Sequence, residues 1–427
     1  MSVTAPRGLS RVRTELECGA VVLAQQTRLT PAVTIHAAFT AGALYEPDGL
    51  TGLAHLTGRL LDRGTERRTG AMIADELDDR GVALKVSTNR HVLTLTCTCL
   101  SEDFDAVLSI LVDVARRPVF PESELALRRA ELVTAYLQDQ DNPATRATEA
   151  LFHLLYGEGH PYSGRIKGTA DSLQRIGRGD LVQFHAARFR PASLSLAVVG
   201  DVEPARVVHR SAMELEGWDG GPPELRGVPP PVEPGTRRAR MVSVPGKSQT
   251  DVAYGFVAIR RLDPRYYAYW LMNNVLGQFG LGGRLADNIR ERQGMAYYAY
   301  SVLDPSVGEG PLVIRAGVDP RNVERAIEAI DHEVDRLGRE GPTPGEVEES
   351  RQYLIGSIPR MLETNQGIAA FLQNAEHFGL GLDYDRRLAQ HLREVTADEV
   401  AAAASELLVP TRAALAVAGP TPADGGA

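Results

Sequence analysis

Two kinds of hydrophobic pattern alternate along the chain, and each predicts a different secondary structure. Apolar residues spaced three and four apart predict helices at 53–62, 71–79, 104–115, 122–137 and 144–156. Shorter stretches rich in β-branched residues predict strands at 33–39, 91–100 and 193–199. Later in the chain the same patterns predict strands at 251–258, 297–303, 312–318 and 413–418, and helices at 265–276, 284–291, 321–339, 344–362 and 397–408. Strands mixed irregularly with long helices favour an α+β fold over a doubly wound sheet.

Residues 217–235 are dense in proline and glycine, which cannot continue a helix or a central strand. This stretch predicts an extended linker between a domain of residues 1–216 and a domain of residues 236–427. Three sequence patterns of the first domain recur in the second in the same order, displaced by 218 to 223 residues. Those around Pro121, Asp180 and Gly200 recur around Pro344, Asp398 and Gly419. A steady displacement over three unrelated patterns predicts that the two domains are copies of one fold.

Composition and charge exclude several classes of protein. With 43% hydrophobic and 24% charged residues, the chain of 427 residues has a globular rather than a disordered or collagen-like composition. The formal net charge of −9 argues against general nucleic-acid binding. Three cysteines cannot form a disulfide framework, which favours a reducing compartment. We find no secretory signal and no stretch approaching about 20 uninterrupted apolar residues, so we expect a cytoplasmic protein without a membrane span.

The most informative motif lies on the helix predicted at 53–62, which reads Gly52-Leu-Ala-His55-Leu-Thr-Gly58-Arg59 and is followed by a Gly-Thr turn. It resembles the inverzincin helix of the pitrilysin/insulinase-type peptidases (family M16), whose H-x-x-E-H motif holds zinc and supplies a general base. Further segments similar to family landmarks follow in order: 140–143, 160–164, 168–169, 190–191, 198–201, 245–249, 276–277 and 290–297. The resemblance covers nearly the whole chain and is closest to the short, dimer-forming branch that includes the mitochondrial processing peptidase. It implies the metallohydrolase fold of that branch, with two homologous tandem domains, each a mainly antiparallel sheet packed against helices.

The residues at the family's metal-site positions differ from the family's own. His55 matches the first zinc ligand, but Gly58 stands at the position of the catalytic glutamate and Arg59 at that of the second histidine. The third ligand of the family, a glutamate, falls at Thr134 or Ala135, neither of which can bind zinc. Catalytic zinc needs three protein ligands and a base for its water. We therefore expect no metal and no hydrolysis by this chain alone.

Two neighbouring features support this expectation. Arg59 places a permanent cation where a zinc dication would sit. Glu131 lies one helical turn from the expected third-ligand position and is a poor substitute for it. His55 is then interpreted as a leftover helix residue rather than a ligand.

Arg290 and Tyr297 are the candidate substrate-binding residues. They lie seven residues apart, across a predicted helix end, a turn at Gly294 and the start of a strand. In the family, an arginine and a tyrosine at this spacing grip substrate backbone carbonyls, and the resemblance implies the same role here, since both side chains can donate to a carbonyl. By spacing alone, a surface arginine beside a half-buried tyrosine is the simpler interpretation. The resemblance also implies that the glycine-rich stretch 278–284 is a mobile, substrate-facing loop.

Together these resemblances imply a non-catalytic subunit of a heterodimeric zinc peptidase. A separate H-x-x-E-H chain would carry the zinc, while this chain supplies half of an enclosed chamber and the Arg290 and Tyr297 side chains for a peptide substrate. Two other roles stay open: a structural subunit like the core proteins of respiratory complexes, and a homodimeric peptide-binding or maturation factor. We expect neither nucleic acid nor membrane as a partner.

Overall fold

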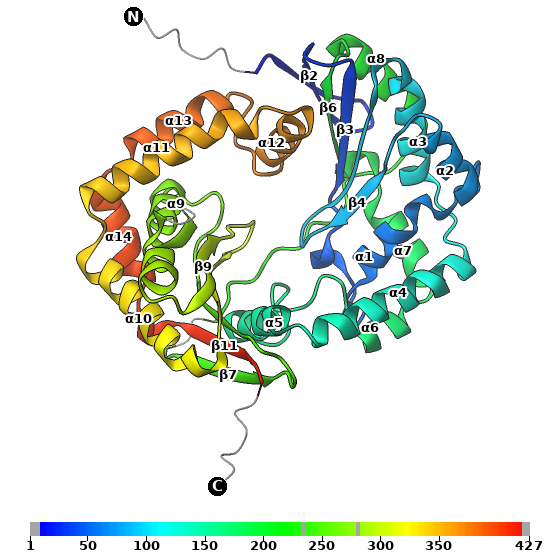
Figure 1. Ribbon diagram of the computed structural model, residues 1–427. Coiled ribbons are helices and arrows are strands. Elements are labelled where there is room, and N and C mark those ends of the chain that lie inside the picture. The colour runs from blue at the N-terminus through cyan, green and yellow to red at the C-terminus, as the bar shows by residue number, and fades with distance from the viewer. Residues whose placement is uncertain (1–8, 233–234, 279–281, 421–427) are drawn as a thin grey trace, which may run out of the picture. The chain divides into compact units, whose positions relative to one another are not determined.

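A computed structural model describes residues 9–232, 235–278 and 282–420, which divide into two units, each built around its own sheet (Figure 1). The first unit contains the described parts of 1–136, 165–226 and 359–387, and the second contains those of 137–164, 227–358 and 388–427. The chain therefore enters each unit more than once. We describe the two units in turn.

The sheet of the first unit has six strands in the order β1-β2-β6-β3-β5-β4. The strands are β1 (Arg11–Glu15), β2 (Val21–Gln26), β3 (Ala32–Phe39), β4 (Lys85–Thr88), β5 (Leu93–Leu100) and β6 (Leu194–Gly200). Only β2 and β6 run parallel, and the other neighbouring pairs are antiparallel. The short strand β4 forms one edge, next to the helix that carries the degenerate zinc motif.

Helices cover both faces of this sheet. They are α1 (Leu53–Leu60), α2 (Gly70–Asp78), α3 (Phe104–Arg116), α4 (Glu122–Gln140), α6 (Ala170–Arg175), α7 (Arg178–Arg188), α8 (Pro204–Leu215) and α12 (Asn365–His377). Because side chains alternate across a strand, Leu196 and Val198 of β6 face the main core, whereas Ala197 and Val199 face the other side. That second face is covered by α12, which lies beside β6 and β3 (Figure 1).

The sheet of the second unit has five strands in the order β7-β11-β8-β10-β9. The strands are β7 (Arg238–Ser243), β8 (Thr250–Val257), β9 (Ala296–Leu303), β10 (Pro311–Val318) and β11 (Ala414–Gly419). Only β7 and β11 run parallel, so the order and directions reproduce those of β2-β6-β3-β5-β4. This common topology confirms the α+β fold and the tandem repeat predicted from the sequence.

The helices of the second unit include two π-helices. The α-helices are α5 (Pro143–Tyr156), α9 (Tyr266–Asn273), α10 (Val323–Glu340), α11 (Pro344–Met361), α13 (Tyr384–Glu394) and α14 (Ala397–Leu407), with the unit boundaries falling inside α4, α11 and α13. The π-helices are Asn274–Gln278 and Ala286–Arg292. The sequence predicted ordinary helices at 265–276 and 284–291. The structure confirms the first as far as Asn273, the end of α9, and corrects the rest of it and nearly all of the second to the π form. The helix period of 3.6 residues indicates a helix but does not distinguish the rarer π form.

One helix of each half belongs to the other unit. Helix α5 begins at Asn142, whose side chain accepts from the Thr145 N–H at 3.2 Å, and its Ala150 and Leu151 pack on β8 and β11. Helix α12 comes from the second half of the chain but covers the first sheet. The contiguous division into 1–216 and 236–427 therefore does not describe the compact units, although the change at 226/227 lies inside the predicted linker. Periodicity shows that a helix has an apolar face but not which sheet that face covers.

Several elements escaped the sequence prediction. The strands β1, β2, β4 and β7 and the helices α7, α8, α12 and α13 were not predicted. Three of these strands lie at or near a sheet edge, where burial is partial and the hydrophobic alternation is weak. Within the described ranges, no helix is long and apolar enough to cross a membrane.

Candidate functional site

The N-terminus of α1 is held in place from two sides. Gly52 precedes the helix with a φ of 96°, and a Cβ built on it would lie 2.9 Å from the Gly168 Cα, so only glycine fits this contact. The buried carboxyl group of Glu46 accepts from the N–H of Ala54 at 2.8 Å and from that of Gly52 at 3.1 Å. These contacts satisfy backbone donors of the first helical turn and fix the helix that carries His55, Gly58 and Arg59.

The first two motif positions lie against the protein interior. His55 is half-buried, and burial, with smaller contributions from the charges of Lys167 and Arg59, lowers its pKa to about 4. Gly58 is buried, and a Cβ there would lie 3.1 Å from side-chain atoms of Val86 and Leu93. The helix therefore packs too closely on β4 and β5 for a glutamate side chain at position 58 to fit without displacement.

Arg59 is paired with a carboxylate of the neighbouring helix. Its Nη2 lies 3.2 Å from Oε2 of Glu131 on α4, and both side chains are about half exposed. Glu131 also accepts from Arg128 at 2.6 Å, and the hydrogen bonds from Arg128 and Arg59 lower its pKa. Sequence reasoning considered Glu131 only as a substitute zinc ligand, whereas the structure makes it the partner of the Arg59 cation. The opposite charges of Arg59 and Glu131 were the sequence feature from which this pair could have been predicted.

The residues at these positions do not fit a zinc ion. Ala135 is half-buried on α4 and has no ligating atom, so His55 is the one residue of the aligned positions with a zinc-binding group. The cations Arg59 and Lys167 beside it oppose a further dication. Within the part of the chain that the structure describes, no three His, Cys, Asp or Glu side chains are grouped to hold a metal ion.

The second unit places Arg290 on an exposed stretch of π-helix. Arg290 lies in the π-helix Ala286–Arg292, and its Nε is 3.4 Å from Oε1 of the adjacent Glu291, with both side chains about half exposed. An exposed pair of neighbouring residues is a weak interaction. The Arg290 guanidinium therefore keeps donors that a peptide carbonyl can use.

Tyr297 is the second residue of the edge strand β9 and is 83% exposed. The sequence alone favoured a half-buried tyrosine here, and its ring is instead almost fully in solvent. An exposed tyrosine of this size offers both an apolar ring and a hydroxyl to a ligand. An edge strand also has unpaired backbone groups, which can pair with an extended peptide. Arg290 and Tyr297 thus lie on adjoining exposed segments, with no hydrogen bond between them in the described structure.

The glycine-rich stretch lies between the two π-helices. Residues 279–281 fall outside the described residues, so the predicted loop is defined only at its ends. There Gly277 and Gly283 approach so closely that a Cβ on Gly283 would lie 2.8 Å from the Gly277 Cα. Glycine is therefore required at these positions by packing of the backbone.

The chain repeats one α+β unit, and the first copy carries the helix of a zinc site without the catalytic base and two of the three zinc ligands. These features define a catalytically incomplete homologue of two-domain zinc peptidases. The chain belongs to peptidase family M16. Residues 21–163 match the family model described as Insulinase (Peptidase family M16), and residues 175–354 match the model described as Peptidase M16 inactive domain.

Relatives and solved structures of the same family cover nearly the whole chain. A protein of Streptomyces coelicolor called an uncharacterized zinc protease is 25% identical over 387 residues, 89% of this chain and 83% of that protein. A Helicobacter pylori protein called a non-peptidase homolog is 24% identical over 385 residues, 89% of this chain and 87% of that protein. The crystal structure of a peptidase M16 inactive domain from Pseudomonas fluorescens superposes with a TM-score of 0.91 at 26% identity, covering 97% of this chain and 99% of that one.

Proposed function

We propose that this chain is the non-catalytic subunit of a heterodimeric M16 peptidase, in which a partner chain with an H-x-x-E-H motif holds the zinc. In this pair, Arg290 and Tyr297 bind backbone carbonyls of a peptide, and this chain forms half of the chamber around it. The partner supplies the activated water, and this chain supplies orientation of the scissile region. We place the pair in the cytoplasm.

One contrast carries the proposal. The positions that would activate water hold a buried glycine and an ion-paired arginine, whereas the positions that would bind substrate hold an exposed arginine and an 83% exposed tyrosine. Tyrosine is enriched at binding interfaces, where its ring packs against a ligand and its hydroxyl forms a hydrogen bond. The non-peptidase homolog and the inactive M16 domain among its relatives support the loss of hydrolysis by this chain.

The first test is a tagged pull-down of the full chain from its native organism, with mass spectrometry of proteins that elute in equal amount. We expect an M16 chain of similar size that carries H-x-x-E-H. A chain that elutes alone as a dimer, or with membrane or biosynthetic proteins, would contradict the heterodimer and favour a peptide-binding or structural role.

The second test measures peptide cleavage by the isolated pair. Replacing Arg290 by Ala or Tyr297 by Phe should reduce kcat/KM by about tenfold, which corresponds to one lost hydrogen bond to the substrate backbone. Arg321→Ala is the control, since this arginine is exposed and its ion pair in the described structure is with the nearby Asp319. Cleavage unchanged by both site variants would contradict the substrate-binding role.

A further inference from the structure

The π-helix Ala286–Arg292 carries side-chain pairs at an unusual spacing. Asp287 lies 2.7 Å from Arg292, and Asn288 Oδ1 accepts from Gln293 Nε2 at 2.7 Å. Both pairs join residues five apart, as does the backbone bond from the Gln293 N–H to the Asn288 carbonyl at 3.1 Å. In an α-helix, residues five apart lie about 140° apart around the axis and cannot pair in this way. The two side-chain pairs therefore fit the π form and not the α form.

The same spacing recurs at the other π-helix. Asn273 Nδ2 donates to Gln278 Oε1 at 3.0 Å, again across five residues. Asn273 is fully buried. Three side-chain pairs with one spacing, at the only two π-helices of the described chain, indicate that these residues select the π form.

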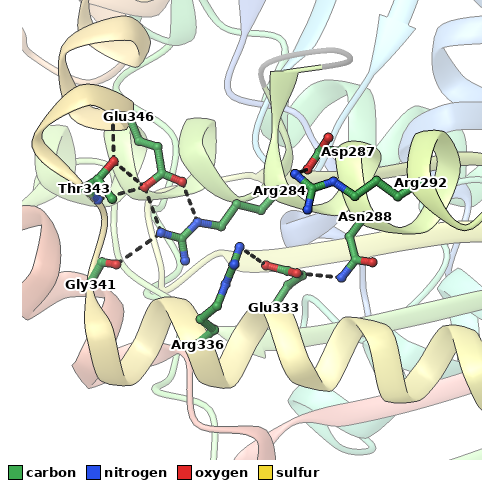
Figure 2. A network of polar contacts seen from close by, with 9 residues as sticks. All are labelled: Arg284, Asp287, Asn288, Arg292, Glu333, Arg336, Gly341, Thr343 and Glu346. Carbon is green, nitrogen blue, oxygen red and sulfur yellow. Dashed lines mark hydrogen bonds and ion pairs between the residues drawn. The ribbon is translucent and has the colours of Figure 1, made fainter.

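The buried side of the second π-helix is anchored to α10 and to the turn after it, as Figure 2 shows. Asn288 Nδ2 donates to Glu333 Oε1 at 2.6 Å, and the other oxygen of Glu333 accepts from Arg336 at 2.6 Å. Glu333 is only 3% exposed, and these two donors satisfy its two buried oxygens. Asn288 thus connects a buried carboxylate to Gln293 at the end of the π-helix.

A second anchor precedes the π-helix. Arg284 forms a two-pronged ion pair with Glu346 at 2.7 and 2.8 Å and donates to the Gly341 carbonyl at 3.2 Å (Figure 2). Arg284 is 9% exposed, and a buried two-pronged pair of this kind has a fixed geometry. Arg290 therefore lies on a segment that is fixed before it by Arg284 and around it by Asn288 and Gln293.

We propose that Asp287, Asn288, Arg292, Gln293 and Glu333 are positioning residues that hold residues 286–292 in the π form and thereby set the direction of Arg290. A change of one residue in helical register turns a side chain by about 100°, which would point the guanidinium away from its present direction. The same segment leads directly into β9, so its register also sets where Tyr297 begins the edge strand. This inference rests on the substrate-binding role proposed above for Arg290 and Tyr297.

The exposed ion pair between Asp287 and Arg292 offers the most direct test of the π form. Asp287→Arg places two arginines five residues apart, which opposes the π form, and it puts an arginine four residues before Glu291, which favours the α form. The double variant Asp287→Arg with Arg292→Asp replaces the repulsion between two arginines by an ion pair at the π spacing, which can compete with the pairing to Glu291. Asn288→Ala removes the link to Glu333. Asp335→Arg is the matched control, because it opposes Arg339 in an exposed pair of the α-helix α10.

The experiment measures amide hydrogen exchange of the full chain and its binding of a fluorescein-labelled pool of randomised 15-residue peptides. In Asp287→Arg and Asn288→Ala we expect amides of 286–297 to exchange about tenfold faster, and peptide affinity to fall about tenfold. The double variant should return both the exchange rate and the peptide affinity to within about twofold of the wild type. If the single residues acted only through packing, the double variant would not restore these values. The control should match the wild type in this segment.

Two results separate this inference from the function on which it rests. The positioning role would be overturned if amide hydrogen exchange of 286–297 were unchanged in both single variants. It would also be overturned if the double variant did not restore the wild-type exchange rate. If exchange responds as expected but Arg290→Ala and Tyr297→Phe bind the peptide pool like the wild type, the positioning role stands and the proposed substrate-binding function fails.

Discussion

Arg59 replaces a zinc-binding histidine of the family, and its pairing with Glu131 shows how the helix accommodates that change. The exposed pair contributes only a few tenths of a kcal/mol to about 1 kcal/mol, so its importance lies in the charge it places at the site. Purified full chain should therefore hold no stoichiometric zinc after mild chelation, measured by elemental analysis. Arg59→Ala should not change this, since removing the cation leaves His55 as a single ligand. Stoichiometric zinc that survives chelation would contradict this account of the site.

Gly58 makes a second residue-level prediction. Gly58→Glu should lower the free energy of unfolding by about 2–3 kcal/mol, because the new side chain must displace Val86 and Leu93. Gly356→Glu is the matched control: Gly356 lies in α11 with open space around it, so a better helix former should stabilise the protein by about 0.5–1 kcal/mol. Urea unfolding measures both. Equal effects at the two positions would mean that α1 does not pack closely on β4 and β5.

At the residue level, the sequence identified which positions of the motif hold residues without a metal-ligating group, because that depends only on residue type and alignment with a motif. It did not predict the Arg59–Glu131 pair or the exposure of Tyr297. Both depend on which surfaces pack together, and a single sequence gives no distances between residues 72 positions apart.

At the level of elements, periodicity identified the helices that bury one broad apolar face, such as α3 and α10. Periodicity was wrong at the π-helices, where the backbone departs from the usual helical period. It follows the apolar residues, whereas the side-chain pairs that favour the π form are polar. It also could not assign α5 to its sheet, and it did not predict α12. Leu151 of α5 and Leu372 of α12 each pack on the sheet of the other half of the chain.

The exchanged helices make a prediction about fragments. A fragment of residues 1–232 lacks α12, so the sheet face formed by Leu23, Ala197 and Val199 stays uncovered. A fragment of residues 235–427 lacks α5, which leaves the alanine-rich face of β11 uncovered. Each fragment alone should bind a hydrophobic dye and unfold without a cooperative transition, whereas the mixed fragments should form a folded complex. Circular dichroism and gel filtration measure this. Cooperative unfolding of either fragment alone would contradict the exchange of helices.

At the scale of the whole molecule, the duplication gives the chain two copies of one fold that carry different side chains at corresponding places. The two sheets share strand order and direction, so β9 with Tyr297 corresponds to β4, next to the degenerate helix α1. The repeat was predictable because three patterns recur at a nearly constant displacement. The uneven chemistry of the two copies follows from single residues in corresponding places, which the fold itself does not constrain.

The pH dependence of stability is also a property of the whole molecule, because it sums buried groups from several elements. Burial lowers the pKa of His55, His91 and His185 to about 4, so these side chains are neutral in the folded protein, whereas the unfolded chain takes up their protons below about pH 6.5. Their contribution to stability is therefore complete above pH 6.5 and is lost as the pH falls toward 4. Burial raises the pKa of Glu46 to about 8, so its contribution is lost in the opposite direction, as the pH rises from about 4.5 to 8.

These opposite dependences predict a maximum of stability near pH 6.5. Between pH 6.5 and pH 5 each of the three histidines should lower the free energy of unfolding by about 1–2 kcal/mol, and Glu46 should raise it by about one such step, which leaves a net fall of about 2–4 kcal/mol. His185→Gln should reduce that fall by one such step, since glutamine can keep the donor that His185 Nε2 offers to the Ala115 carbonyl at 2.8 Å. His332→Gln, on the exposed face of α10, is the control and should leave the fall unchanged. Urea unfolding at pH 5, 6.5 and 8 measures these values, and an acid loss as large in His185→Gln as in the wild type would show that His185 is not buried in its neutral form.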